Sequence, residues 1–89
     1  MNADKNWGLK VRTRAEKTIA RFPRKDALVL LEAIELLPRN PFAGDIEKMK
    51  GEENIWRRRI GAYRIFYELR INENVVYVFR VERRASKTY

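Results

Sequence analysis

The sequence predicts an α+β domain in which a two-helix hairpin packs on one face of a mainly antiparallel, four-stranded sheet, in the order strand, helix, helix, strand, strand, strand. Two amphipathic segments separated by a single proline predict the hairpin, because so short a connection makes the helices antiparallel. Three consecutive segments rich in β-branched and aromatic residues predict a strand meander. The apolar side of the helices needs a sheet to cover, so we expect one domain over residues 1–89.

The amino-terminal half supplies the first strand and both helices. Residues 7–11 alternate between apolar and polar, as in a half-buried strand. Thr13 to Glu16 fits a capping box, and apolar residues then recur at helical spacing as far as Pro23. The second helix is expected from Arg24 to Leu37, with a broad apolar side, and Pro38 ends it.

The remaining half is predicted to be loop and strand. Residues 39–44 form a loop by their proline and glycine content, and residues 45–51 are ambiguous. The expected strands are Ile55–Ile60, Tyr63–Leu69 and Val75–Arg83, with turns at residues 61–62 and 72–74. Simple alternation predicts these helix-facing residues: Trp56, Ile60, Tyr63, Ile65, Tyr67, Leu69, Val75, Tyr77, Phe79 and Val81.

Composition limits the function classes. The chain has 20 Lys and Arg against 12 Asp and Glu, a net charge of +8, so an acidic partner such as nucleic acid is expected. The absence of Cys and His excludes disulfides, thiol nucleophiles, imidazole chemistry and the usual zinc ligands, and we expect no metal or other cofactor. The longest apolar runs, residues 27–31 and 75–79, are too short to span a membrane, so we expect a cytoplasmic protein with no membrane partner.

The segment from residue 56 to residue 67 reads as a tight hairpin that collects arginines. A two-residue turn at residues 61–62 sets Arg59 opposite Arg64 and places Arg57 on the same face. Like charges directly opposite each other destabilise a sheet, and phosphate binding would explain why they are brought together. Alternation puts Arg58 on the helix side unless a bulge re-aims it, so its direction stays open.

These residues carry a resemblance to the RelE/ParE superfamily of type II toxins. The superfamily pattern is an aromatic residue, alternating basic residues, Gly, any residue, Tyr-Arg, an apolar strand, and a basic residue followed by a terminal Tyr. It resembles Trp56 to Tyr67 and the ending Arg83 to Tyr89, and the match implies a RelE-like fold over nearly the whole chain. RelE-like members cleave messenger RNA on the translating ribosome, ParE-like members poison DNA gyrase, and a cognate antitoxin silences both.

The resemblance to the RelE-like branch also implies roles for individual residues. There the ribose 2′-hydroxyl attacks its adjacent phosphate, so charge on the phosphate must be stabilised and the leaving oxygen neutralised. The match implies that Arg64 stabilises the phosphorane-like transition state, that Arg83 neutralises or protonates the leaving oxygen, and that Tyr89 stacks on or orients a base. The expected catalytic set is Arg59, Arg64, Arg83 and Tyr89, and the expected RNA-binding set is Arg57, Arg58, Arg80 and Arg84.

The general base stays open. The RelE-like pattern has lysines where Arg57 and Arg59 stand, and a guanidinium, with a pKa above about 12, does not give up its proton. Tyr89 or a carboxylate must then accept the proton, and the candidate carboxylates are Glu52, Glu53 and Glu82.

The leading function is therefore an endoribonuclease that needs the ribosome, with messenger RNA, the ribosome and a cognate antitoxin as partners. The filled positions Arg64, Arg83 and Tyr89 favour it, since ParE-like chains generally lack that late constellation. A gyrase inhibitor and a non-catalytic RNA-binding module are the alternatives.

Overall fold

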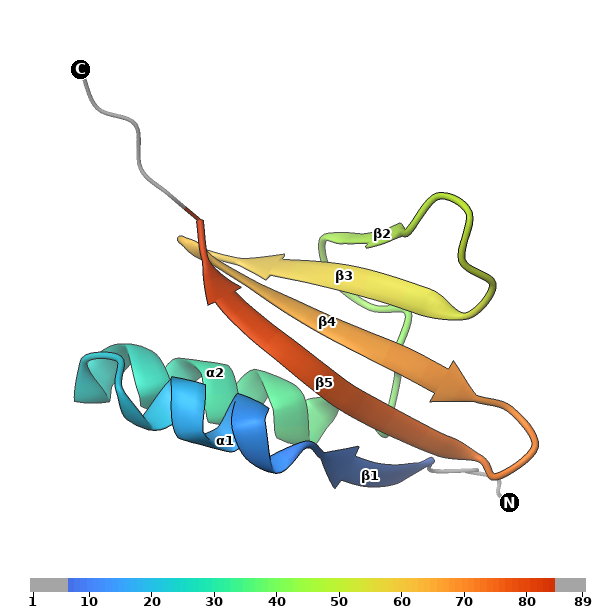
Figure 1. The fold of residues 1–89 in the computed structure, drawn as a ribbon, viewed down its shortest axis with the longest axis horizontal. Helices are drawn as coiled ribbons and strands as arrows, with labels where there is room; N and C mark the ends of the chain where they lie inside the picture. Colours follow the sequence, from blue (N-terminus) through green and yellow to red (C-terminus); the bar gives the residue numbers. More distant parts are fainter. Residues whose placement is uncertain (1–6, 85–89) are drawn as a thin grey trace.

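The computed structural model describes residues 7–84. The elements are β1 (Gly8–Val11), α1 (Thr13–Ala20), α2 (Arg24–Leu36), β2 (Ile46–Lys48), β3 (Ile55–Ile60), β4 (Tyr63–Arg70) and β5 (Val75–Arg83) (Figure 1). Within this part of the chain no helix is long and apolar enough to cross a membrane.

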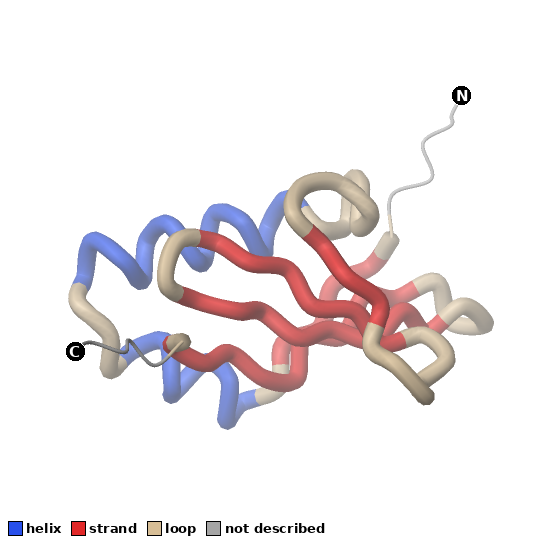
Figure 2. The backbone as a smooth tube through the Cα atoms, turned by 90° about the horizontal axis from the view of Figure 1, so that it is seen from above, coloured by secondary structure: helices blue, strands red, loops and turns tan. Residues whose placement is uncertain are grey.

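The strands form one sheet in the order β1-β5-β4-β3-β2, and both helices lie on one side of it (Figures 1 and 2). β1 pairs with β5 in parallel, and the other neighbours are antiparallel. The α+β class and the helical hairpin are confirmed, but the prediction of four strands is wrong. The additional strand, β2, has three residues, of which only Ile46 is apolar, so it is too short to show a period.

The core lies between the helices and β4 and β5. Ala15 and Ile19 of α1 and Leu30 of α2 are at most 2% exposed, and α1 packs against β5. Burying a large aliphatic side chain contributes about 1.5–3 kcal/mol, so this layer fixes which face of the sheet is left open. The other buried members are Ala33, Ile34, Leu37, Tyr63, Ile65, Tyr67, Leu69, Val76, Val78 and Val81.

A bulge in β5 changes the helix-facing set. The β4–β5 register shifts between Phe66, which pairs with Arg80, and Tyr67, which pairs with Val78, so Phe79 is the extra residue. The prediction that Tyr77 and Phe79 face the core is therefore wrong. It counted every second residue from Val81 toward the start of β5, and the inserted residue shifts that count by one. Val75 is likewise replaced in the core by Val76, and Val78 joins it.

The start of α1 also differs from the prediction. Arg12 is the N-cap, no side chain caps the helix, and Thr13 is the first helical residue, so the predicted capping box is wrong. The Arg12 N–H donates to Val78 C=O at 2.9 Å, which continues the sheet up to the residue before the helix. The Thr13 hydroxyl therefore lies one residue too late to act as a cap.

The outer face of α2 is unexpectedly apolar. Leu28, Val29, Leu31 and Leu36 are 42–55% exposed, on the side opposite Leu30 and the rest of the core set. Leu28 and Leu31 broaden the apolar pattern in the sequence without entering the core. A helix with an exposed apolar side is typical of a surface that a partner covers.

A candidate nucleic-acid interface on the open face of the sheet

The β3–β4 hairpin gathers arginines on the face that the helices leave open. Arg59 pairs with Arg64 and Arg57 with Phe66, which confirms the predicted register. Gly61 turns the chain with a φ of +57°, a conformation that glycine adopts without strain. Because the alternate residues of β4 are in the core, these three arginines point away from it.

Carboxylates hold two of these three arginines. Arg57 forms an ion pair with Glu47 on β2, and Arg64 Nη1 lies 3.7 Å from Glu82 Oε1 on β5. Glu82 Oε2 also lies 2.6 Å from Arg80 Nη2. Arg59, the exposed member, forms no ion pair within residues 7–84. The face therefore offers one unneutralised guanidinium beside a row of partly neutralised ones.

The cluster also has unsatisfied donors. The Nε atoms of Arg57 and Arg64 are buried and have no hydrogen-bond acceptor among the residues that the structure describes. The Nε atom of Arg58 shares this lack, so it does not distinguish the cluster. Guanidinium groups suit phosphate because their N–H groups form a planar fork.

Arg58 lies on the other side of the sheet. It pairs with Ile65, a fully buried core residue, as alternation predicts. Its guanidinium packs against the loop at Gly44, where an added Cβ would be 2.8 Å from Arg58 Nε. The structure thus separates Arg58 from the rest of the expected RNA-binding set.

Arg83 is at the end of β5, opposite Tyr63. Its guanidinium carbon lies 5.8 Å from the Tyr63 ring centroid, on the helix-facing side and not on the face of Arg59 and Arg64. The Tyr63 hydroxyl donates to Asp26 Oδ2 at 2.6 Å, and this hydrogen bond, with burial and the Asp26 charge, raises the Tyr63 pKa while Arg83 opposes the rise.

The three expected catalytic residues that the structure describes, Arg59, Arg64 and Arg83, therefore lie at one end of the sheet but not on one face. Arg84 follows Arg83 there, and its N–H donates to Ala62 C=O at 2.6 Å beside the β3–β4 turn. Alternation also predicts this side from the sequence, because Arg83 is two residues after Val81, which was expected to face the helices. Tyr89 lies outside the described residues.

Comparison with known proteins identifies the family. Residues 9–87 match the family model described as the ParE toxin of the type II toxin–antitoxin system parDE. The chain belongs to this family. It is thus a toxin of the RelE/ParE superfamily, as the motif in β3 and β4 predicts.

The individual relatives carry RelE names. The toxin is 26% identical over 81 residues to the putative toxin RelE1 of Methanocaldococcus jannaschii, a match that covers 88% of this chain and 90% of the relative. It superposes on RelE in the RelE–RelB complex of Pyrococcus horikoshii with a TM-score of 0.80 at 21% identity, covering 92% and 99% of the two chains. For isolated Escherichia coli RelE the TM-score is 0.78 at 18% identity, with 91% and 87% covered. These superpositions show that the toxin has the RelE fold.

Aromatic residues on the open face were missed in the sequence. Phe66 and Phe79 have ring centroids 6.4 Å apart, and Tyr77 stacks on Phe79 at 6.3 Å. Arg80 lies 5.3 Å over Phe66, and Arg70 lies 4.1 Å over Tyr77. The β5 bulge turns Tyr77 and Phe79 toward this face, and no pattern in the sequence marks the bulge. The toxin therefore carries a row of aromatic rings beside the arginine cluster, in which Phe66 is buried and Tyr77 and Phe79 are half-buried. Partly exposed rings of this kind suit unstacked bases.

Two carboxylates touch the cluster. Glu82, a candidate base in the sequence, contacts Arg64, and Glu47, which no sequence pattern singles out, contacts Arg57. Glu52 and Glu53, the other candidate carboxylates, lie in the loop between β2 and β3, and neither pairs with a cluster arginine in the described chain. Glu47 is brought to Arg57 by β2, so its role depends on a strand that the sequence does not reveal.

Proposed function

We propose that this toxin is an endoribonuclease that cleaves messenger RNA in the A site of the ribosome and so stops translation. The observation that carries the proposal is the open-face cluster, in which Arg59 lies opposite Arg64 and forms no ion pair among the described residues. A fold that aligns two cations across a sheet loses stability there, and binding a phosphate offsets that loss. The setting is the cytoplasm, where ribosomes are found.

In the proposed reaction the 2′-hydroxyl oxygen of the ribose attacks its own 3′-phosphate. The new P–O2′ bond forms as the P–O5′ bond breaks, which leaves a 2′,3′-cyclic phosphate and a 5′-hydroxyl. Arg59 and Arg64 stabilise the charge on the phosphate. Arg83 lies on the helix-facing side at the end of β5, so to neutralise the leaving oxygen its side chain must swing around that end of the sheet. No metal is required, because the guanidinium groups provide the positive charge.

Glu82 is the carboxylate we propose as the base. Its Oε1 atom lies 3.7 Å from Arg64, and its Oε2 atom is held by Arg80 at 2.6 Å. A phosphate that binds Arg64 therefore arrives beside a carboxylate already oriented by a second arginine. The proton of the 2′-hydroxyl would pass to Glu82 and then to the leaving oxygen, directly or by way of Tyr89.

The proposed protein partner is a cognate antitoxin. Structural neighbours of the toxin include RelE–RelB complexes from Pyrococcus horikoshii, Mycobacterium tuberculosis and Escherichia coli. The exposed leucines and valine on the outer face of α2 offer such a partner an apolar surface, and the arginine cluster offers acidic residues a counter-charge.

The decisive test is primer extension on messenger RNA in a translating extract. The parent should produce cuts in A-site codons, and Arg64→Ala should reduce the cleavage rate about 10²–10³-fold, the usual effect of losing one charge-stabilising donor. Arg39→Ala is the matched control, because Arg39 is an exposed arginine in the loop after α2 and belongs neither to the β3–β4 hairpin nor to its arginine cluster. Equal loss in both variants, or no cuts with the parent, would refute the proposal.

A ParE-like gyrase inhibitor is the second candidate, because the family model that matches is a ParE toxin. Purified toxin that blocks supercoiling by DNA gyrase in an assay without ribosomes, while messenger RNA stays intact, would establish this alternative. The two assays together assign the toxin to one branch.

A further inference from the structure

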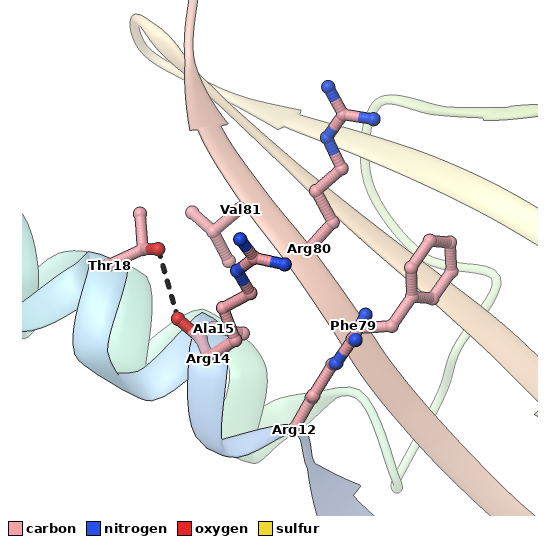
Figure 3. A pocket seen from close by; sticks show the side chains of 7 residues that line it. All are labelled: Arg12, Arg14, Ala15, Thr18, Phe79, Arg80 and Val81. Atoms are coloured by element: carbon pink, nitrogen blue, oxygen red, sulfur yellow. Dashed lines mark hydrogen bonds between the residues drawn. The ribbon is translucent and has the colours of Figure 1, made fainter.

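A second cationic site lies between α1 and β5, outside the cluster described above. It is a cleft of about 500 Å³ (Figure 3). The cleft exists because the pairing of β1 with β5 stops at Val78, where the chain leaves the sheet to start α1. The residues that line it are Arg12, Arg14, Ala15, Thr18, Phe79, Arg80 and Val81.

The charge of the cleft is of one sign. Three of its lining residues are arginines and none is acidic. Arg12 and Arg14 are exposed and form no ion pair within residues 7–84, while Arg80 is held by Glu82. Figure 3 shows the Arg12 and Arg14 side chains extending from the start of α1 toward β5, while Arg80 and Phe79 project from β5 on the side away from α1. This arrangement suits an anion that several guanidinium groups approach together.

The wall of the cleft adds features that suit a nucleotide. Phe79, the extra residue of the β5 bulge, presents a half-buried aromatic ring. Along a strand, the main-chain N–H and C=O groups of successive residues point alternately to the two neighbouring strands. The Arg84 N–H points to β4, so the main-chain groups of Val81, three residues earlier, point the other way, to the edge of β5 that lies beyond the end of β1. The cleft thus combines guanidinium groups, an aromatic surface and free main-chain polar groups.

The cleft is also continuous with the cluster. Arg80 lines the cleft and pairs with Glu82, and the same carboxylate contacts Arg64 on the open face. An RNA strand whose scissile phosphate lies at Arg64 therefore reaches the cleft by crossing over β5. The aromatic row lies along that crossing, since Arg80 covers Phe66 and Phe79 adjoins it.

We propose that the cleft is a second phosphate-binding subsite, in which Arg12 and Arg14 hold the backbone of the RNA strand at a nucleotide outside the scissile position. The inference rests on the proposed function, since it takes RNA as the ligand. Arg12 and Arg14 set affinity and the path of the strand and take no part in bond cleavage. Phosphate contacts of this kind position a strand without reading its sequence.

The test measures binding apart from cleavage. A fluorescent single-stranded RNA of about 12 nucleotides is titrated with purified Arg64→Ala toxin, which leaves the RNA intact, at several salt concentrations. Adding Arg12→Gln and Arg14→Gln should weaken binding roughly tenfold and reduce the slope of log K against log salt by about 0.7 for each phosphate that the toxin ceases to neutralise. Arg12→Lys with Arg14→Lys should keep most of the slope, because the charge is retained. Arg39→Gln, in the same background, is the control.

The outcomes separate this inference from the proposed function. If the glutamine pair and Arg39→Gln have the same affinity and salt slope, the cleft does not bind RNA, whatever the extract assay shows. If the glutamine pair weakens only the complex with an antitoxin, the cleft is a protein site and the inference fails. In the otherwise unsubstituted toxin, the glutamine pair should raise the KM for ribosome-bound message and leave kcat unchanged, whereas a fall in kcat alone would contradict a positioning role.

Discussion

Removing the charge of Arg59 should make the toxin more stable and inactive at the same time. Arg59 lies directly opposite Arg64 and has no ion pair in the described chain, so the pair is repulsive in the absence of a ligand. A cross-strand pair of this kind changes stability by about 0.2–1 kcal/mol. We expect Arg59→Gln to raise the free energy of unfolding by about 0.5 kcal/mol, which is about 2–4 °C in Tm for a domain of this size.

Arg57→Gln is the matched control for this effect. Arg57 is on the same face of the same strand, but it lies opposite Phe66 and pairs with Glu47. Its replacement removes an attraction instead of a repulsion, so its Tm should stay the same or fall. Both substitutions remove one charge from a chain of net charge +8, so a change in net charge alone would affect them equally.

The measurement is thermal unfolding followed by circular dichroism at low salt and at 1 M salt. The gain from Arg59→Gln should disappear at 1 M salt, where the Debye length falls to about 3 Å. A variant that melts at or below the parent temperature in low salt, or a gain that salt leaves unchanged, would refute the reasoning. In the translating extract the same variant should lose most of its cleavage, since the charge that destabilises the free toxin is the one proposed to bind phosphate.

Two further predictions concern the packing that supports the hairpin. Burial raises the Tyr67 pKa from 10.0 to about 12. The stability from its neutral phenol is therefore fully present below about pH 10 and is lost as the pH rises to 12, by about 2 kcal/mol. In Tyr67→Phe, the free energy of unfolding measured by urea titration should fall less between pH 10 and pH 12 than it does in the parent. An equal fall in both proteins would contradict the assignment to Tyr67. Gly44→Ala should destabilise the toxin by about 1–2 kcal/mol from its φ of +88°, and further because the Cβ displaces Arg58. Gly51→Ala, at φ +78° with open space around it, isolates the backbone cost, and equal urea midpoints for the two variants would show that Arg58 yields freely.

The sequence predicted those parts of the fold that depend on local, periodic signals. The two helices and the hairpin register follow from apolar spacing and from the turn at Gly61, so the Arg59–Arg64 pair could be placed from the sequence alone. β2 could not be predicted, because a three-residue edge strand is specified by its neighbour β3 and not by its own pattern. The bulge at Phe79 is likewise a property of the paired sheet and not of the local pattern, and it reverses which residues of β5 before Phe79 face the helices.

The same distinction explains which site residues were found. Arg57, Arg59 and Arg64 belong to one hairpin, so a single turn fixes their common face. Glu47 depends on β2, and Arg12 and Arg14 reach β5 only through the crossover from β1 to α1. Chemistry contributed by distant segments is invisible to local patterns.

The arrangement of acidic residues gives a physical reason for how so basic a face remains folded without a ligand. Glu47 and Glu82 come from the two strands that flank the hairpin, and each neutralises one arginine of the cluster. Partly exposed ion pairs contribute at most about 1 kcal/mol each, so a polyanion with several phosphates can displace them at little cost. Arg59 is left without such a counter-charge in the described chain, which makes it the guanidinium that an incoming phosphate meets first. On the proposed mechanism, phosphate then draws Arg64 from Glu82 and leaves that carboxylate oriented by Arg80 beside the ribose, so substrate binding itself frees the base.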